Sequence, residues 1–211
     1  MTSHTRAQRR TPVRRAVTAG ALAAGALLLT ACGGDGGSGG TAHGGHDGSA
    51  SASARAGSFN DADVAFAQMM IPHHEQALEM ARLAPDRASD PEVKKLATKI
   101  EKAQAPEIRT MKGWLTSWNE PTAMESMPGM DHGGGDGMMS GTDMAHLKGM
   151  KGADFDEMFT EMMIDHHNGA IGMAEDEQKK GENADAVKTA DDIVTSQSAE
   201  VEQLKGILGR L

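Results

Sequence analysis

Two pairs of adjacent histidines stand in nearly identical surroundings. The stretch MMIPHHEQALEMA covers 69–81, and MMIDHHNGAIGMA covers 162–174. Each places two imidazoles beside thioethers in an apolar run, where an unpaired imidazole is costly. Imidazole and thioether together select Cu(I) among common biological metals, with Ag(I) as its mimic. The pattern therefore makes a soft-metal site the first hypothesis.

The two histidines of each pair must point in different directions. Adjacent residues on a helix are separated by roughly 100°, so His73 and His74 cannot both face a bundle centre. His73 shares its stripe with methionines, whereas His74 is expected to face the partner helix, and the second pair repeats this arrangement. The candidate metal ligands are His73, His74, Met70, Met80, His166, His167, Met163 and Met173.

A second helix in each half supplies polar partners. Gln104 and Glu107 lie three residues apart on an inward seam, and Gln197 and Glu200 repeat them. A buried glutamate is rare unless it is paired. These four residues are interpreted as partners that surround the metal ligands. The alternative is a hydrogen-bonded network of His, Gln and Glu that only fixes helix register.

The whole chemical pattern lies in a duplicated helical hairpin. Matching residues 61–115 with 154–208 gives 19 identities in 55 positions, 11 of them in the first 21. Apolar steps of 4, 3, 4, 3 and 4 from Phe66 onward are typical of a buried helical seam, and Asp90 followed by Pro91 predicts the start of a second helix. Hairpins 59–118 and 152–211 are predicted to pack as an all-α four-helix bundle.

The connection at 119–151 is rich in glycine and methionine. Long loops inside compact domains are usually functional or disordered. Seven of the chain's 16 methionines are in this loop, where packing is not expected to explain them. It is expected to contain at most a helical turn near 142–148. The loop candidates for metal binding are Met124, Met127, Met130, His132, Met138 and Met139.

Motifs typical of enzymes are missing. The bundle repeats contain no Glu-x-x-His, which disfavours a di-iron carboxylate centre. His74-Glu75 is not followed by the histidine of a zinc hydrolase motif, and there is no G-x-S-x-G nucleophile. We therefore expect no catalytic residue and no enzymatic activity.

The N-terminus has the layout of an export signal. Five arginines precede a short apolar run that ends in Leu-Thr-Ala-Cys at Cys32, the single cysteine of the chain. This ending resembles a lipobox, which implies cleavage after 1–31 and lipid attachment to Cys32 on the outer face of the cell membrane. Residues 32–58 read as a Gly/Ser tether. The arginines leave the choice between general and twin-arginine export open.

Charge narrows the range of partners. The formal charge of −9 falls to −14 when the signal is removed, because the signal carries five arginines and no acidic residue. An acidic surface repels phosphate backbones, so no nucleic acid partner is expected. The expected partners are a metal ion and, through the lipid anchor, the membrane. A protein partner is not identified.

The doubled pattern F-x-x-M-M-I-x-H-H-x-x-A-x-x-M-A, with I-x-x-x-Q-x-x-E on the following helix, resembles the domain-of-unknown-function 305 (DUF305) family. The resemblance covers nearly all of 59–211. It implies a ferritin-like four-helix fold, export from the cytoplasm and, for some members, copper binding. Pro72 and Pro106 depart from the repeat, where Asp165 and Ala199 stand, and a proline inside a helix is expected to bend it.

These observations predict an extracytoplasmic, lipid-anchored protein that binds copper, expected as Cu(I), for sequestration, delivery or tolerance. Two alternatives stay open. One is an interaction module at the cell surface that binds no metal. The other, less favoured, is a redox metalloenzyme on a ferritin-like bundle.

Overall fold

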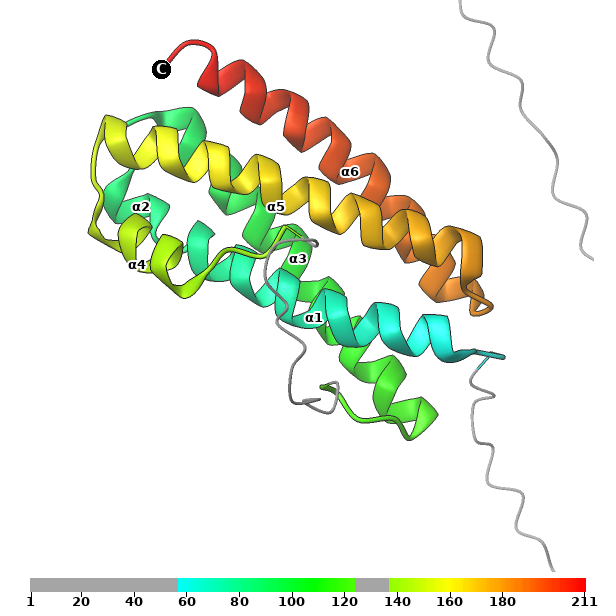
Figure 1. The fold of residues 1–211 in the computed structure, drawn as a ribbon. Helices are drawn as coiled ribbons and strands as arrows, with labels where there is room; N and C mark the ends of the chain where they lie inside the picture. Colours follow the sequence, from blue (N-terminus) through cyan, green and yellow to red (C-terminus); the bar gives the residue numbers. More distant parts are fainter. Residues whose placement is uncertain (1–56, 124–136) are drawn as a thin grey trace, which may run out of the picture. The chain divides into compact units, whose positions relative to one another are not determined.

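A computed structural model describes residues 57–123 and 137–211. Four long helices form a bundle, as predicted, with two short helices beside them (Figure 1). No strand occurs in the described residues, although an isolated bridge pairs Ala88 with Gly152. The elements are α1 (Asp61–Ala81), α2 (Ala84–Arg87), α3 (Pro91–Trp118), α4 (Gly141–Gly149), α5 (Ala153–Lys180) and α6 (Ala184–Leu208).

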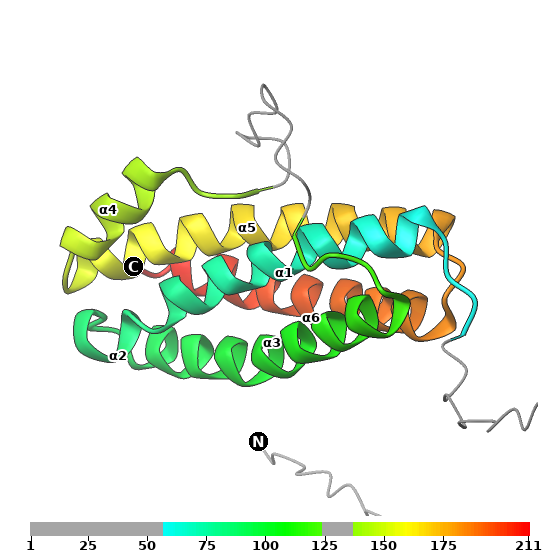
Figure 2. The ribbon, with the colours of Figure 1, turned by 90° about the horizontal axis from the view of Figure 1, so that it is seen from below.

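The bundle consists of two hairpins. Helix α1 packs against α3, α5 packs against α6, and the hairpins meet mainly along α1 and α5. Figure 2 shows the four long helices side by side, with α4 outside the bundle near α5. None of the helices in the described part of the chain has the length and hydropathy needed to cross a membrane.

Side-chain caps define where the long helices begin. Asn60 accepts hydrogen bonds from the backbone N–H groups of Ala62 and Asp63, and the Asp63 carboxylate accepts one from the backbone of Asn60. Asp90 caps α3 with Pro91 in its first turn, as predicted. These caps satisfy backbone donors that a helix start leaves unpaired.

The two internal prolines do not divide their helices. Helix α1 runs through Pro72, and α3 runs through Pro106. Each proline lies next to a residue of the histidine centre, Pro72 beside His73 and Pro106 beside Glu107. The departure from the repeat therefore leaves both helices intact where they carry these side chains.

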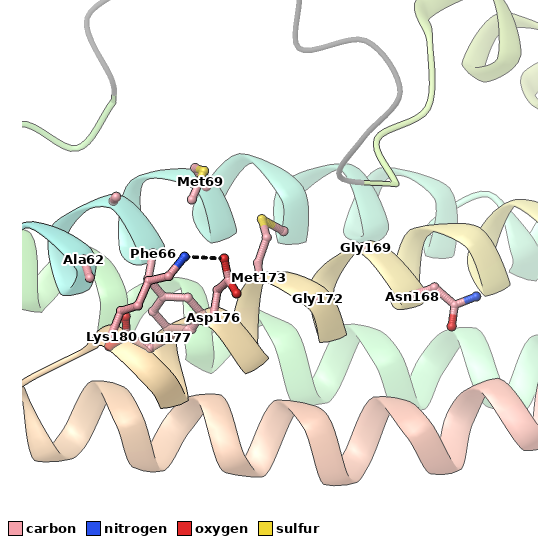
Figure 3. Close-up of a pocket in the computed structure, with 11 residues that line it drawn as sticks. Ala62, Phe66, Met69, Asn168, Gly169, Gly172, Met173, Asp176, Glu177 and Lys180 are labelled. Atoms are coloured by element: carbon pink, nitrogen blue, oxygen red, sulfur yellow. Dashed lines mark hydrogen bonds and ion pairs between the residues drawn. The ribbon is translucent and has the colours of Figure 1, made fainter.

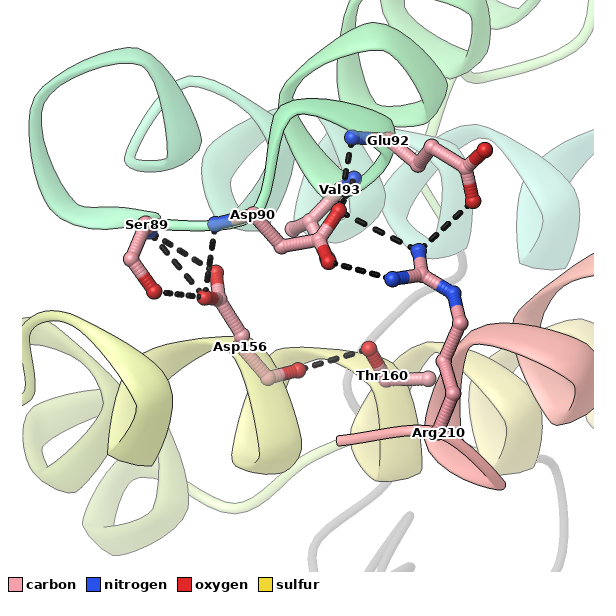
Figure 4. A network of polar contacts seen from close by, with 7 residues as sticks. All are labelled: Ser89, Asp90, Glu92, Val93, Asp156, Thr160 and Arg210. Carbon is pink, nitrogen blue, oxygen red and sulfur yellow. Dashed lines mark hydrogen bonds and ion pairs between the residues drawn. The ribbon is translucent and has the colours of Figure 1, made fainter.

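Two buried aspartates join the halves. Asp156 of α5 accepts hydrogen bonds from the backbone N–H of Asp90 (2.8 Å), the backbone N–H of Ser89 (3.0 Å) and the Ser89 hydroxyl (Figure 4). Asp63 of α1 accepts from the backbone N–H groups of Asn183 (2.9 Å) and Glu182 (3.2 Å). Each half thus anchors the start of the other half's second helix.

The fold corrects one expectation about the connecting loop. Met144 of α4 is buried in a core cluster, and Met139 and Met150 pack against the same cluster. Packing therefore explains these three methionines, contrary to the prediction. The helical turn expected near 142–148 is confirmed as α4, which begins with a Ser140 capping box.

Candidate metal centre

Two histidines from the two halves meet at the middle of the bundle. The ring centroids of His73 (α1) and His166 (α5) lie 3.7 Å apart, with their planes tilted by 38°. Both side chains are buried. The sequence predicted that the first histidine of each pair faces the bundle centre, and this placement is confirmed. The contact joins equivalent positions of the duplicated halves.

The second histidine of each pair faces its own hairpin partner, also as predicted. His74 Nε2 lies 2.8 Å from Glu107 Oε2, and His167 Nε2 lies 2.8 Å from Glu200 Oε2. A carboxylate only accepts hydrogen bonds, so the Nε2 atom donates here, and in the neutral form of the ring Nδ1 carries the lone pair. Carboxylate–histidine pairs of this kind commonly orient metal-binding imidazoles.

The two glutamates differ in their surroundings. The Glu107 side chain is 25% exposed, whereas that of Glu200 is 4% exposed and also receives Lys99 Nζ at 3.4 Å. Burial alone would raise the pKa of Glu200. The hydrogen bond from His167 and the charges of His167 and Lys99 outweigh burial and lower the pKa below its ordinary value. Glu200 is therefore a carboxylate at neutral pH.

Electrostatics keep the central imidazole neutral. Burial holds the pKa of His166 well below its ordinary value, and the charges of His73, His167 and His74 add to this effect. A hydrogen bond between the His73 backbone and the His166 ring acts in the opposite direction. A neutral imidazole keeps one nitrogen lone pair, which a metal ligand requires. Among the described residues, neither His166 nitrogen has a side-chain partner, and Nδ1 of His74 and of His167 has no hydrogen-bond partner.

Two buried amides lie on the helices that carry Glu107 and Glu200. Gln104 and Gln197 are 2% and 3% exposed, and neither has its full set of hydrogen bonds within the described residues. A completed hydrogen-bond network would leave no such groups, because buried polar groups are normally paired. Unpaired buried nitrogens and amides therefore favour a centre that receives a ligand over one that only fixes helix register.

The predicted methionines lie in two apolar clusters. Met70 and the partly buried Met173 belong to one cluster, whereas Met163 and Met80 belong to the other. Along α1 the histidines stand between Met70 and Met80. The structure thus brings His73 and His166 into contact but distributes the thioethers between two clusters rather than in one group.

The connecting chain passes over the histidine layer. Gly137, at φ +76°, packs so closely on α5 that a Cβ would lie 2.5 Å from the Asp165 carbonyl and 3.1 Å from that of His166. Two residues later, the Met139 backbone exchanges hydrogen bonds of 2.7 and 2.9 Å with the Gln76 side chain of α1. Met138 lies between these anchors in the chain, so the backbone of one predicted loop methionine is held against α1 and α5.

Several predicted features fall outside the described residues. Cys32, the signal, the tether up to residue 56, Met124, Met127, Met130 and His132 are among them. Within the described ranges, no group of three or more His, Cys, Asp and Glu side chains is placed to share one metal ion.

Sequence reasoning missed the buried aspartates and Glu177. Asp63 and Asp156 are identical in the two repeats and stand in the first turns of equivalent helices, which was an available signal. Their partners are 67 and 120 residues away, and no periodicity indicates such distances.

The fold and its centre define a class: helical bundles that enclose a polar, imidazole-rich layer. The family described as Domain of unknown function (DUF305) matches residues 63–208. The chain therefore belongs to the DUF305 family. No match was found among curated proteins.

Solved structures of relatives share the fold. A DUF305 protein from Streptomyces coelicolor, described as secreted, is 31% identical, with 71% of this chain and 93% of that chain covered and a TM-score of 0.65. A DUF305 fragment from Deinococcus radiodurans is 30% identical, with coverage of 72% and 98% and a TM-score of 0.66. CopM in its Cu(II)-bound form is 37% identical, with coverage of 70% and 96% and a TM-score of 0.62. Other CopM structures are described as Cu(I)-bound and Ag-bound.

Proposed function

We propose that this protein binds copper as Cu(I) at the centre of its bundle, outside the cytoplasm, and serves copper sequestration, delivery or tolerance. The observation that carries the proposal is the central pair, His73 and His166. These buried imidazoles meet across the two halves, and among the described residues neither His166 nitrogen has a side-chain hydrogen-bond partner. CopM, a relative with copper-bound structures, supports the choice of metal.

The donor chemistry fits a soft ion. Neutral imidazoles would be joined by the thioethers of Met70 and Met163 from the two flanking clusters. Methionines of the connecting loop would add further thioethers. Imidazole and thioether donors suit Cu(I), whereas carboxylate-rich sites suit harder metals. Glu107 and Glu200 would orient His74 and His167 rather than bind the metal themselves.

The role we propose is binding rather than catalysis, and the location is the outer face of the membrane. A lipid on Cys32 would hold the bundle there through the tether. The S. coelicolor relative's description as secreted supports an extracytoplasmic site, and the lipobox-like sequence before Cys32 supports the anchor.

Removing the central pair is expected to abolish tight binding. Changing His73 and His166 to Ala should weaken Cu(I) affinity by at least about a hundredfold, since loss of even an outer-shell partner costs about 10–100-fold. The measurement is a Cu(I) titration of the purified protein against a competing chromophoric chelator. The matched control is His146→Ala, which removes an exposed histidine of α4 and should leave the affinity unchanged.

Thermal unfolding without metal should show that the double variant retains the fold. An unchanged Cu(I) affinity in a folded His73→Ala/His166→Ala protein would contradict the proposal. That result would indicate that the two histidines serve packing and helix register instead.

A further inference from the structure

A pocket opens between α1 and α5 at the end of the bundle where α1 begins. Its volume is about 340 Å³, and Figure 3 shows its side chains coming from both helices. Two thioethers lie in it, Met69 from α1 and Met173 from α5. Ala62, Ala65, Phe66 and Gly169 also line it, and its polar wall includes Asp176, Glu177 and Lys180.

The duplication predicts a second groove of the same kind at the other end. Residues 93 positions apart are equivalent, so Met69 and Met173 correspond to Met162 and Met80, and Phe66 corresponds to Phe159. These three equivalents are buried in one cluster together with Met144 and Leu147 of α4. Helix α4 therefore covers the second groove, whereas the described residues that line the first come from α1 and α5 alone.

Small residues explain why the first groove is open. Gln76 and Glu79 of α1 hold the covering segment, through hydrogen bonds to Met139 and an ion pair to Lys148. Their equivalents in α5 are Gly169 and Gly172, which have no side chain to hold such a segment, although the Gly137 backbone packs closely on Gly169. Ala62 and Ala65 also stand where the other half has Phe155 and Met158, and these smaller side chains leave more space in the groove.

The open groove has the chemistry of a soft-cation site. Met69 is 38% exposed, although large apolar side chains elsewhere on the described helices are mostly covered. Thioethers bind Cu(I) and Ag(I), and an aromatic face attracts a cation placed over it. The nearby cation, Lys180, is paired with Asp176 at 2.8 Å, so its charge is largely balanced.

We infer that this groove is a second soft-metal site, in which Met69 and Met173 bind Cu(I) or Ag(I) beside the Phe66 ring. The inference rests on the proposed function in taking a soft metal as the protein's ligand. Among the described residues Met69 is left partly exposed and the lining of the groove does not include the buried histidines, so metal exchanges there faster than at the bundle centre. It is suited to capture and release, and the centre to retention.

The test uses Ag(I), which needs no reductant, and the full protein with methionine methyl groups labelled with ¹³C. Single Met69→Leu and Met173→Leu variants assign the two methyl signals, because each deletes one. Leucine conserves volume and the fold. On addition of Ag(I), both signals should shift in fast exchange, and the double variant should lose one equivalent of bound Ag(I). Met162→Leu, at the covered equivalent position, is the matched control and should keep that equivalent.

Repeating the titration on the His73→Ala/His166→Ala protein separates the two proposals. If the Met69 and Met173 signals still shift in this variant, the result supports the groove site. This holds even if the histidine change leaves tight binding intact, a result that would contradict the central site. Tight binding that depends on the histidines, with Met69 and Met173 signals unmoved, overturns the groove site and leaves the central site standing. Equal Ag(I) stoichiometry in the Met69→Leu/Met173→Leu protein also overturns it.

Discussion

Replacing Asp156 by alanine is expected to lower the free energy of unfolding by about 3 kcal/mol, because buried donors left unpaired cost about 1–3 kcal/mol each. The carboxylate is fully buried and accepts from the backbone N–H groups of Ser89 and Asp90 and from the Ser89 hydroxyl. Ser89 is partly reached by water, so the loss falls short of the sum of three such donors. Chemical denaturation with the metal-free protein measures the change.

The same loss should lower the melting temperature by roughly 6–12 °C for a domain of this size. Asp154→Ala is the matched control, because Asp154 is exposed in the same turn of α5 and its removal should cost roughly 0.5 kcal/mol or less. The unfolding free energy of Asp156→Asn should lie between those of the Asp154→Ala and Asp156→Ala variants, since the amide of the new side chain retains one acceptor oxygen. Equal unfolding free energies for the Asp154 and Asp156 variants would show that the link between the halves contributes little.

The sequence predicted those features of the centre that depend on helical geometry. Adjacent histidines must diverge on any helix, so the inward His73 and the hairpin-facing His74 follow from spacing alone. The Gln-x-x-Glu spacing likewise placed Glu107 and Glu200 toward their hairpin partners. Duplication then implied that the two inward histidines come from equivalent positions.

Features that depend on distant contacts were not predictable in the same way. The burial of Met144 requires α4 to fold back over α1 and α5, and no periodicity in a glycine-rich connection indicates this. The difference between the two grooves depends on single departures from the repeat, such as Gly169 where Gln76 stands in the other half. Each departure is visible in the sequence, but its effect is clear only once the covering helix is placed.

Departures from the repeat also explain how each buried aspartate obtains its third contact. At Asp156 the additional donor is the Ser89 hydroxyl. At Asp63 the equivalent position carries Glu182, and the neighbouring group is instead the buried Glu177 carboxyl, which lowers the pKa of Asp63 and whose own equivalent is Ala84. One half thus uses a hydroxyl that does not titrate, and the other uses an acid that does.

The contribution of Glu177 to stability is consequently expected to fall as the pH rises from about 5 to about 8. Burial, with the hydrogen bond and charge of Asp63, raises the pKa of Glu177 from 4.5 to about 8. In this window the folded protein holds a proton on Glu177 that the unfolded chain has lost, so each increase in pH favours unfolding. Above about pH 8 both states are ionised and the dependence ends. Chemical denaturation at pH 5, 7 and 9 measures it.

Glu177→Gln should remove this dependence. The amide can donate to Asp63 at every pH and carries no charge, so the variant should match the native protein near pH 5 and exceed its unfolding free energy at pH 9. Glu175→Gln is the matched control, since Glu175 is an exposed carboxylate on the same helix and its replacement should preserve the native pH profile. If the difference in unfolding free energy between Glu177→Gln and the native protein is the same at pH 5 and pH 9, Glu177 and Asp63 do not share a proton in the folded protein.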